Sequence, residues 1–203
     1  MLKKLLYSVG NLLGIALFTF LCTATLQSYQ ATGSLFAFGI VLVNGLILIL
    51  YFVRREPNAL IELPFAWLIS IATTLLPFLY RPTREAFLPE LLSAGYSLQL
   101  IGVAAIIGAL LSLRGSIGIV PANRGIKRGG LYRIVRHPLY ASELLFFTGY
   151  VLSNQSVFNF LLLLLSFAMQ YSRSRIEENF LINDPGYKLY MSRTRYRFIP
   201  GLL

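Results

Sequence analysis

A short stretch between two apolar segments gathers most of the reactive side chains of the sequence. Residues 129–145, GGLYRIVRHPLYASELL, contain the single histidine, His137, followed by Pro138 and Tyr140. Proline disfavours helical geometry in the residue before it and suits the first position of a helix. His137 and Tyr140 are therefore expected at a helix N-terminus, a rigid and partly positive setting that suits a ligand-binding site.

A second polar group, RSRIEENFL, follows the last long apolar segment. Arg173 and Glu177 are four residues apart and would share one face of a helix. Arg175 and Glu178 are three apart and would pair on a neighbouring face. A salt-bridged, solvated helix end explains these charges without any function. The preceding hairpin is short, however, so this helix end is expected to return close to His137.

Glu143 is an acid inside an apolar helical segment, six residues after His137. A carboxylate at membrane depth is costly and usually faces protein or a cavity. Residues 140, 143 and 147 fall along one helical stripe, so Glu143 is expected to face the same cavity as Tyr140. The alternative is a position close enough to the interface for the carboxylate to reach water.

The loop at 114–133, RGSIGIVPANRGIKRGGLYR, contains five glycines and a proline. Glycine lets a backbone turn sharply and approach a ligand closely, and free backbone groups suit the edge of a nucleoside. A flexible connector with arginines that face lipid is the alternative.

The polar groups together suggest two kinds of ligand. Acids and aromatic faces suit an onium group, and arginines suit a carboxylate or phosphate. Methyl transfer from a sulfonium donor to an acidic, lipid-like acceptor would use both. Simple phospholipid binding would use the same residues.

The elements that position these groups are membrane helices. The chain has 203 residues, of which 56% are hydrophobic and only 13% are charged. Such a composition, with several long apolar runs, is typical of an integral membrane protein. We predict an all-α, polytopic membrane helix bundle of about six spans in a single domain, with plain helices in 1–113 and the polar groups in 114–203. The six apolar segments are 5–26, 35–53, 60–79, 91–113, 139–152 and 157–172, and the last two are expected to form a helical hairpin.

The distribution of basic residues predicts the orientation. The formal net charge is +10, and of the 18 lysines and arginines only Arg81 and Arg84 fall in the loops on one side, which leaves 16 on the other. The positive-inside tendency then places both termini in the cytoplasm. Anionic lipid headgroups explain the charge more simply than nucleic acid does. One cysteine, Cys22, and one histidine leave no disulfide and no metal spacing.

The N-terminal segment has two lysines, an apolar stretch and then small residues, as a signal peptide does. Further apolar spans follow it, so we expect a retained first helix.

Three motifs in order resemble the isoprenylcysteine carboxyl methyltransferase family of membrane enzymes, a wider group that includes phospholipid N-methyltransferases. They are NRGIKRGGLYRIVRHPLY, an apolar hairpin, and RIEENFL followed by DPGYKLYMSRTRYRFIP, and together they cover about 114–200. The earlier helices match only as generic membrane spans. The resemblance implies a methyltransferase with S-adenosylmethionine as cofactor, a cofactor pocket at the cytoplasmic face and a lipophilic acceptor, for which an isoprenylcysteine-like carboxylate is one candidate.

The resemblance also implies roles for individual residues. Arg173 would bind the acceptor carboxylate, and Glu177, one turn later, would bind the cofactor; both are the catalytic candidates. Glu178 would share the cofactor-binding role, and Glu143 is assigned to the acceptor site. The other cofactor-binding candidates are Arg124, Gly125, Ile126, Lys127, Tyr132, His137, Pro138, Leu139 and Tyr140.

Two other functions fit parts of the sequence. HPLYASE matches the pattern H-P-x-Y-x-x-E, which resembles membrane steroid and enone reductases that use NADPH. A non-enzymatic membrane protein whose basic face binds anionic lipids would need no cofactor. The surrounding NRGIKRGGLYR and RIEENFL favour the methyltransferase.

Overall fold

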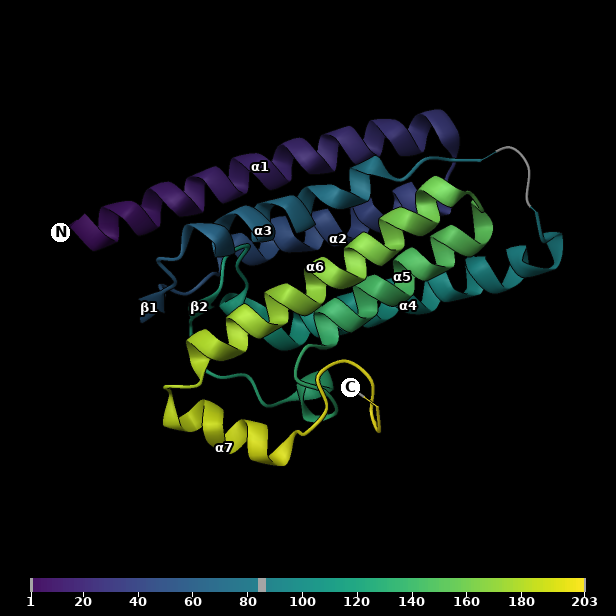
Figure 1. The fold of residues 1–203 in the computed structure, drawn as a ribbon. Coiled ribbons are helices and arrows are strands. Elements are labelled where there is room, and N and C mark those ends of the chain that lie inside the picture. The colour runs from purple at the N-terminus through teal and green to yellow at the C-terminus, as the bar shows by residue number, and fades with distance from the viewer. Residues whose placement is uncertain (1, 84–86, 203) are drawn as a thin grey trace.

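The computed structural model describes residues 2–83 and 87–202 and consists mostly of helices that run side by side (Figure 1). Arg84, one of the two cationic residues predicted for the outer loops, lies outside the described residues. The helices are α1 (Leu2–Thr32), α2 (Leu35–Phe52), α3 (Pro64–Leu75), α4 (Leu92–Leu113), α5 (Pro138–Ser153), α6 (Val157–Leu181) and α7 (Pro185–Arg193).

The remaining elements are short. Four 3₁₀ turns, η1 (Leu76–Leu79), η2 (Pro89–Leu91), η3 (Arg114–Ser116) and η4 (Gly130–Arg133), connect or extend the helices. Within the described residues, the only sheet is an antiparallel pair of two-residue strands, β1 (Ala59–Leu60) and β2 (Ala122–Asn123). The prediction of a mainly helical fold is therefore confirmed.

Three helical segments are long and apolar enough to cross a membrane: Tyr7–Thr32, Leu35–Phe52 and Pro89–Ser116. A fourth apolar segment, Pro64–Leu79, is shorter. The predicted count of six spans therefore stays a prediction. The α5–α6 hairpin has the predicted place in the chain, but α6 continues to Leu181, well past the predicted apolar end at residue 172.

Capping residues explain where several helices begin. The Ser34 hydroxyl accepts from the Ala37 N–H at the start of α2, and the Ser156 hydroxyl accepts from the Asn159 N–H at the start of α6. These contacts satisfy backbone donors that have no partner inside the helix. Pro138 occupies the first turn of α5, as its fixed φ favours.

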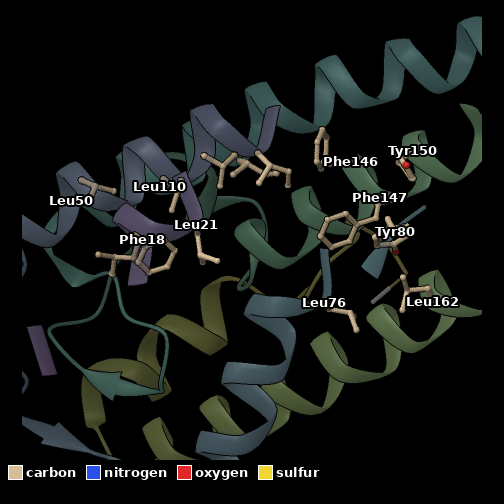
Figure 2. Packing of buried hydrophobic residues seen from close by; sticks show 14 of the residues in the cluster. Phe18, Leu21, Leu50, Leu76, Tyr80, Leu110, Phe146, Phe147, Tyr150 and Leu162 are labelled. Carbon is tan, nitrogen blue, oxygen red and sulfur yellow. The ribbon is translucent and has the colours of Figure 1, made fainter. Parts of the chain in front are cut away.

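The centre of the bundle combines large apolar side chains with one close backbone contact. Figure 2 shows Phe18, Leu50, Leu110 and Phe147, from four different helices, in the same buried cluster. Between α4 and α5 the backbones approach closely, because a Cβ atom on Gly149 would lie 2.6 Å from the backbone N of Gln99. The site-bearing helix α5 is thus fixed against α4.

The polar segments lie toward one end of the bundle. In Figure 1 the N-terminus, β1, β2 and α7 gather at one end, whereas the α1–α2 turn and the α5–α6 hairpin lie at the other. The sequence predicts that the first of these ends faces the cytoplasm.

Candidate functional site

The loop between α4 and α5 packs against the connection between α2 and α3. Besides the β1–β2 pairing, Arg54 Nε donates to the carbonyl of Ile117 at 2.9 Å, and Arg124 Nε donates to the carbonyl of Arg55 at 3.2 Å. Burial, followed by the charge of Arg54, lowers the pKa of Arg124 to about 10. The glycine-rich loop is therefore anchored at several points and is not a free connector.

The same loop also contacts α7 and the residues around it. Asn123 Nδ2 donates to Asp184 Oδ2 at 2.8 Å, while the other oxygen of Asp184 caps α7 at the Gly186 N–H. The hydrogen bond from Asn123, then that from Gly186, lowers the pKa of the Asp184 carboxyl group. The Tyr190 hydroxyl donates to the carbonyl of Tyr132 at 2.7 Å. The α4–α5 loop is thus fixed both to the α2–α3 connection and to helix α7.

His137 and Tyr140 stand at the start of α5 and contact two adjacent acids of α6. Their rings stack, with centroids 5.3 Å apart and planes 8° from parallel. The Tyr140 hydroxyl donates to Glu177 Oε2 at 2.8 Å, and His137 Nε2 lies 3.1 Å from Glu178 Oε1. The start of α5 and the end of α6 are therefore in direct contact, as the short hairpin predicts.

Glu178 is the centre of a buried ion-pair cluster. Its side chain is 6% exposed and contacts Arg136 Nε at 2.8 Å, both Nε and Nη2 of Arg197, and His137. Burial alone would raise the pKa of Glu178, but hydrogen bonds from His137, Arg197 and Arg136 outweigh it and hold the pKa well below its usual value. Glu178 is thus a buried carboxylate whose oxygens are occupied by cations of the protein itself.

The C-terminal strap, residues 194–198, runs across the start of α5. The Arg136 N–H donates to the carbonyl of Tyr196, and the His137 N–H donates to the carbonyl of Arg197, both at 2.9 Å. Phe198 is buried, with its ring centroid 6.0 Å from that of His137. The strap is therefore fixed to the start of α5 by two backbone hydrogen bonds, and its Phe198 ring lies near the His137 ring.

Arg173 lies one turn before Glu177 and binds other partners. Its Nη1 donates to the Thr73 hydroxyl at 3.2 Å, its Nη2 donates to the carbonyl of Ile119, and its guanidinium carbon lies 5.0 Å from the centroid of the Tyr140 ring. Its Nε is buried and has no hydrogen-bond partner among the residues that the structure describes. An unsatisfied charged donor at this position is a candidate contact for a bound anionic or polar group.

Of the two local charge pairs expected from the spacing on α6, neither forms a salt bridge in the described part of the chain. Arg173 and Glu177 share a helix face but make separate contacts, and Arg175 is exposed while Glu178 pairs with Arg136 and Arg197. The expectation of an Arg175–Glu178 pair was wrong, because partners brought in by the loop and the strap are buried and form more hydrogen bonds.

Three adjoining cavities occupy this end of the bundle. The loop cavity lies under the glycine-rich loop and α7, the junction cavity lies between the start of α5 and the end of α6, and the bundle cavity continues between the helices. The loop and junction cavities share Arg124, Tyr132, His137 and Glu177, among others. The junction and bundle cavities share Ile117, Gly118, Leu139 and Arg173.

Most of the predicted site residues line these cavities. The loop and junction cavities are both lined by Arg124, Tyr132, His137 and Glu177. The loop cavity is also lined by Gly125, Ile126 and Lys127, and the junction cavity by Tyr140. The junction and bundle cavities are both lined by Leu139 and Arg173. Pro138 and Glu178 line none of the three.

Two expectations need adjustment. Glu143 lines the bundle cavity and Tyr140 the junction cavity, so the two do not face a common space, although Leu139 and Arg173 border both cavities. The cofactor-binding role of Glu178 stays a prediction that its cationic partners do not favour. The motif DPGYKLYMSRTRYRFIP contains Tyr187 and Tyr190, but neither was predicted to be a site residue. Both line the loop cavity, and their spacing of three residues in α7 was the available signal.

A comparison with known families gives one match. Residues 94–184, from α4 to the start of α7, match the family described as phospholipid methyltransferase. No curated protein sequence matches the chain. The matched segment contains the glycine-rich loop, both site helices and Glu177, and it implies a membrane methyltransferase. Residues 94–184 thus match the phospholipid methyltransferase family, which is related to the isoprenylcysteine carboxyl methyltransferases, and the relationship indicated by the motifs is confirmed.

Proposed function

We propose that the protein transfers a methyl group from S-adenosylmethionine to a lipophilic acceptor at the cytoplasmic face of a membrane. The observation that carries this proposal is that the three cavities adjoin one another. The loop and junction cavities share Glu177 as a lining residue, and the junction cavity shares Arg173 with the apolar bundle cavity. A soluble cofactor and a lipid-borne acceptor would meet at Arg173.

The side chains of the two polar cavities fit the chemistry of the cofactor. Glu177 carries a half-buried carboxylate whose Oε2 accepts a hydrogen bond from Tyr140 and lies 4.0 Å from His137 Nδ1. Within the described residues its Oε1 has no hydrogen-bond partner, so it can still accept from a ligand or balance a sulfonium charge. Tyr132 and Tyr187 offer aromatic faces beside it, and the backbone of 125–127 borders the same space. Aromatic faces and a carboxylate are the groups that attract an onium ion.

The residues of the chain would act by positioning. S-adenosylmethionine, when bound, supplies an activated methyl group. Glu177 and the loop would hold the cofactor, and Arg173 would hold a polar group of the acceptor through its free Nε. His137, stacked on Tyr140 and hydrogen-bonded to Glu178, orients the pocket wall and is not proposed as a base. Alignment of two bound reactants contributes on the order of 7–11 kcal/mol to lowering a barrier in favourable cases.

The proposal includes the membrane arrangement expected from the sequence. The chain would form a single domain of six spans, with both termini and the polar cavities at the cytoplasmic face. Three helices have the length and composition of membrane spans, and the basic segments gather toward one end of the bundle, which supports this arrangement.

Calorimetry on the purified protein tests the proposed function. S-adenosylhomocysteine is expected to bind at micromolar concentration, and Glu177→Gln and His137→Ala are expected to abolish or strongly weaken that binding. Binding of NADPH in its place would show a reductase. If the protein has a normal helical content and unfolding transition but binds neither S-adenosylhomocysteine nor NADPH, the methyltransferase is rejected and a lipid-binding role is left.

Arg173→Ala separates the acceptor side from the cofactor side. We expect it to leave the affinity for S-adenosylhomocysteine within about twofold of the wild type and to reduce methyl transfer to a membrane lipid extract by about 10²-fold or more, because its loss removes an acceptor contact. Transfer is measured with a labelled methyl donor. Equal loss of binding and transfer would contradict this division of roles.

A further inference from the structure

The lining of the bundle cavity extends along α2. It runs from Ile40 to Tyr51 in a helical stripe, and the rise over these twelve residues is about 16 Å. This is close to half of the roughly 30 Å hydrocarbon core of a bilayer. Most of the other lining residues are also apolar, including Phe18, Phe146 and Phe147. The lining therefore suits an apolar part of a ligand.

Besides the hydroxyl groups of Tyr51, Thr73 and Thr74, one amide and two charged side chains interrupt this apolar lining: Asn44, Glu143 and Arg173. Asn44 is 6% exposed, and within the described residues its Nδ2 has no hydrogen-bond partner, like the Nε of Arg173. A buried donor without a partner costs about 1–3 kcal/mol, so a ligand with hydrogen-bond acceptors would be stabilised by these two donors. The polar head of the acceptor is thus expected to reach into the bundle cavity.

Glu143 supplies a hydrogen-bond acceptor in the same cavity. Its Oε2 accepts from Gln170 Nε2, and within the described residues it forms no salt bridge with Arg173, although both line the cavity. It lies one helical turn after Leu139, which borders the junction cavity as well. A carboxylate is therefore available one turn from the place where the cofactor and the acceptor would meet.

The charges of the bundle cavity argue against an anionic acceptor. Arg173 and Glu143 are the only charged residues among its described lining, and with Glu143 ionised the two charges cancel. A free carboxylate would add a second negative charge to a water-poor space, and an unpaired charge there is costly. A neutral acceptor with a proton to donate would preserve the cancellation and hydrogen-bond to Glu143.

We propose that Glu143 accepts the proton of the methyl acceptor, whose nucleophile is therefore a proton-bearing oxygen or nitrogen on an apolar chain and not a free carboxylate. This inference rests on the proposed function. As the bond from the nucleophile to the methyl carbon forms, the carbon–sulfur bond breaks and its electron pair stays on sulfur. The bond between the nucleophile and its hydrogen breaks, and the proton goes to Glu143, which later releases it to water.

Three probes with similar apolar chains test the inference on the full protein in lipid nanodiscs: 4-nonylphenol, 4-nonylaniline, which is a neutral amine near pH 7, and dodecanoate. With labelled S-adenosylmethionine, the wild type is expected to methylate the phenol or the amine faster than the carboxylate. Glu143→Gln keeps the size of the side chain and an oxygen for Gln170, and it is expected to reduce kcat for the reactive probe by about 10²–10⁴-fold. Glu143→Asp should restore part of that loss.

The matched control is Glu90→Gln, which removes an exposed acid from η2, away from the cavities, and should leave transfer unchanged. Faster methylation of dodecanoate, or a wild-type rate in Glu143→Gln, would overturn the inference. If no probe is methylated, the affinity of each probe for the complex of the protein with S-adenosylhomocysteine tests the inference instead. The wild type should prefer 4-nonylphenol to dodecanoate by about tenfold or more, and Glu143→Gln should narrow that preference; an unchanged preference, or no binding of any probe, also overturns it.

Failure of the proposed function gives a different result. If S-adenosylhomocysteine does not bind the folded wild type, the methyltransferase itself is rejected. If it binds equally to the wild type and to Glu143→Gln, and the variant transfers methyl groups at the wild-type rate, only the role of Glu143 is rejected.

Discussion

The helix bundle and the polar cap of this protein are held together by different forces. The polar cap is the α4–α5 loop, residues 114–137, together with α7 and the C-terminal strap. In the bundle, α4 and α5 meet at Gly149 through close backbone contact, and apolar side chains fill the remaining space. In the cap, hydrogen bonds and the ion pairs of Glu178 hold the chain together with a small buried cluster of Tyr132, Leu181, Tyr187 and Tyr190. The cap should therefore respond to charge and pH under conditions that leave the bundle intact.

The largest expected effect is that of Glu178→Ala. Loss of one partner from a buried ion pair typically costs about 3–5 kcal/mol, because the remaining charges stay buried without compensation. Arg136 and Arg197 would lose their common partner, and the C-terminal strap should detach. We expect faster proteolysis after residue 193 and weaker binding of S-adenosylhomocysteine, with the helical circular dichroism of the bundle nearly unchanged.

Glu62→Ala, which removes an exposed acid, is the control for this change and should leave the strap protected. A strap that resists protease equally well in Glu178→Ala would show that the ion pairs do not hold it.

Gly149→Ala should act on the bundle instead. The new Cβ would meet the backbone N of Gln99 and, at 2.7 Å, the carbonyl of Gly95, and backbone atoms cannot move aside as side chains do. Overpacking of this kind costs about 1–3 kcal/mol. Thermal unfolding should show a lower transition temperature for the whole protein. Gly45→Ala provides the comparison, since its Cβ would meet only Cys22 Sγ at 3.9 Å; equal effects of the two changes would contradict the close contact.

Acid should loosen the cap before it unfolds the bundle. The folded-state pKa of Glu178 lies below the ordinary value of 4.5, so its contribution to stability is fully present above pH 4.5. That contribution is lost as the pH falls below 4.5 toward the lower folded-state pKa. Protease sensitivity of the strap, measured with an acid-tolerant protease, should rise in this window in the wild type. The rise should be absent in Glu178→Gln, whose strap should be loose at every pH; a wild-type profile in this variant would assign the transition to another group.

The smallest expected effect is that of Arg175→Ala. The side chain is exposed and has no salt bridge in the described part of the structure, and surface changes of this kind alter stability by less than about 0.5 kcal/mol. Urea unfolding of the two proteins should coincide. A loss above about 1 kcal/mol would mean that Arg175 supports Glu178 after all, as the local spacing suggested.

The helices and the site residues could be predicted from the sequence because their signals are local. Pro138 and Ser156 lie where the predicted helices begin, and apolar runs mark the helix bodies. The sequence also predicted contact between the start of α5 and the end of α6, because the hairpin between them is short.

The arrangement of the cap could not be predicted, because it depends on partners far apart in the chain. Asn123 bonds to Asp184 across 61 residues, and Glu178 finds Arg136 at a separation of 42. The spacing of Arg175 and Glu178 is consistent with a local ion pair. Only the fold of the loop and the strap shows that Glu178 pairs with Arg136 and Arg197 instead. Helical spacing likewise predicted that Glu143 and Tyr140 face one cavity. In the structure Glu143 lines the bundle cavity and Tyr140 lines the junction cavity, and Leu139 and Arg173 border both cavities.

The central claim is that one cofactor binds between the loop and the end of α6. Hydrogen–deuterium exchange of the purified protein with and without S-adenosylhomocysteine tests it most directly. The account predicts slower exchange at 122–140 and 177–190 on addition of the ligand, with α1 and α2 unchanged. Unchanged exchange at both segments in the presence of saturating ligand, or protection confined to other helices, would contradict it.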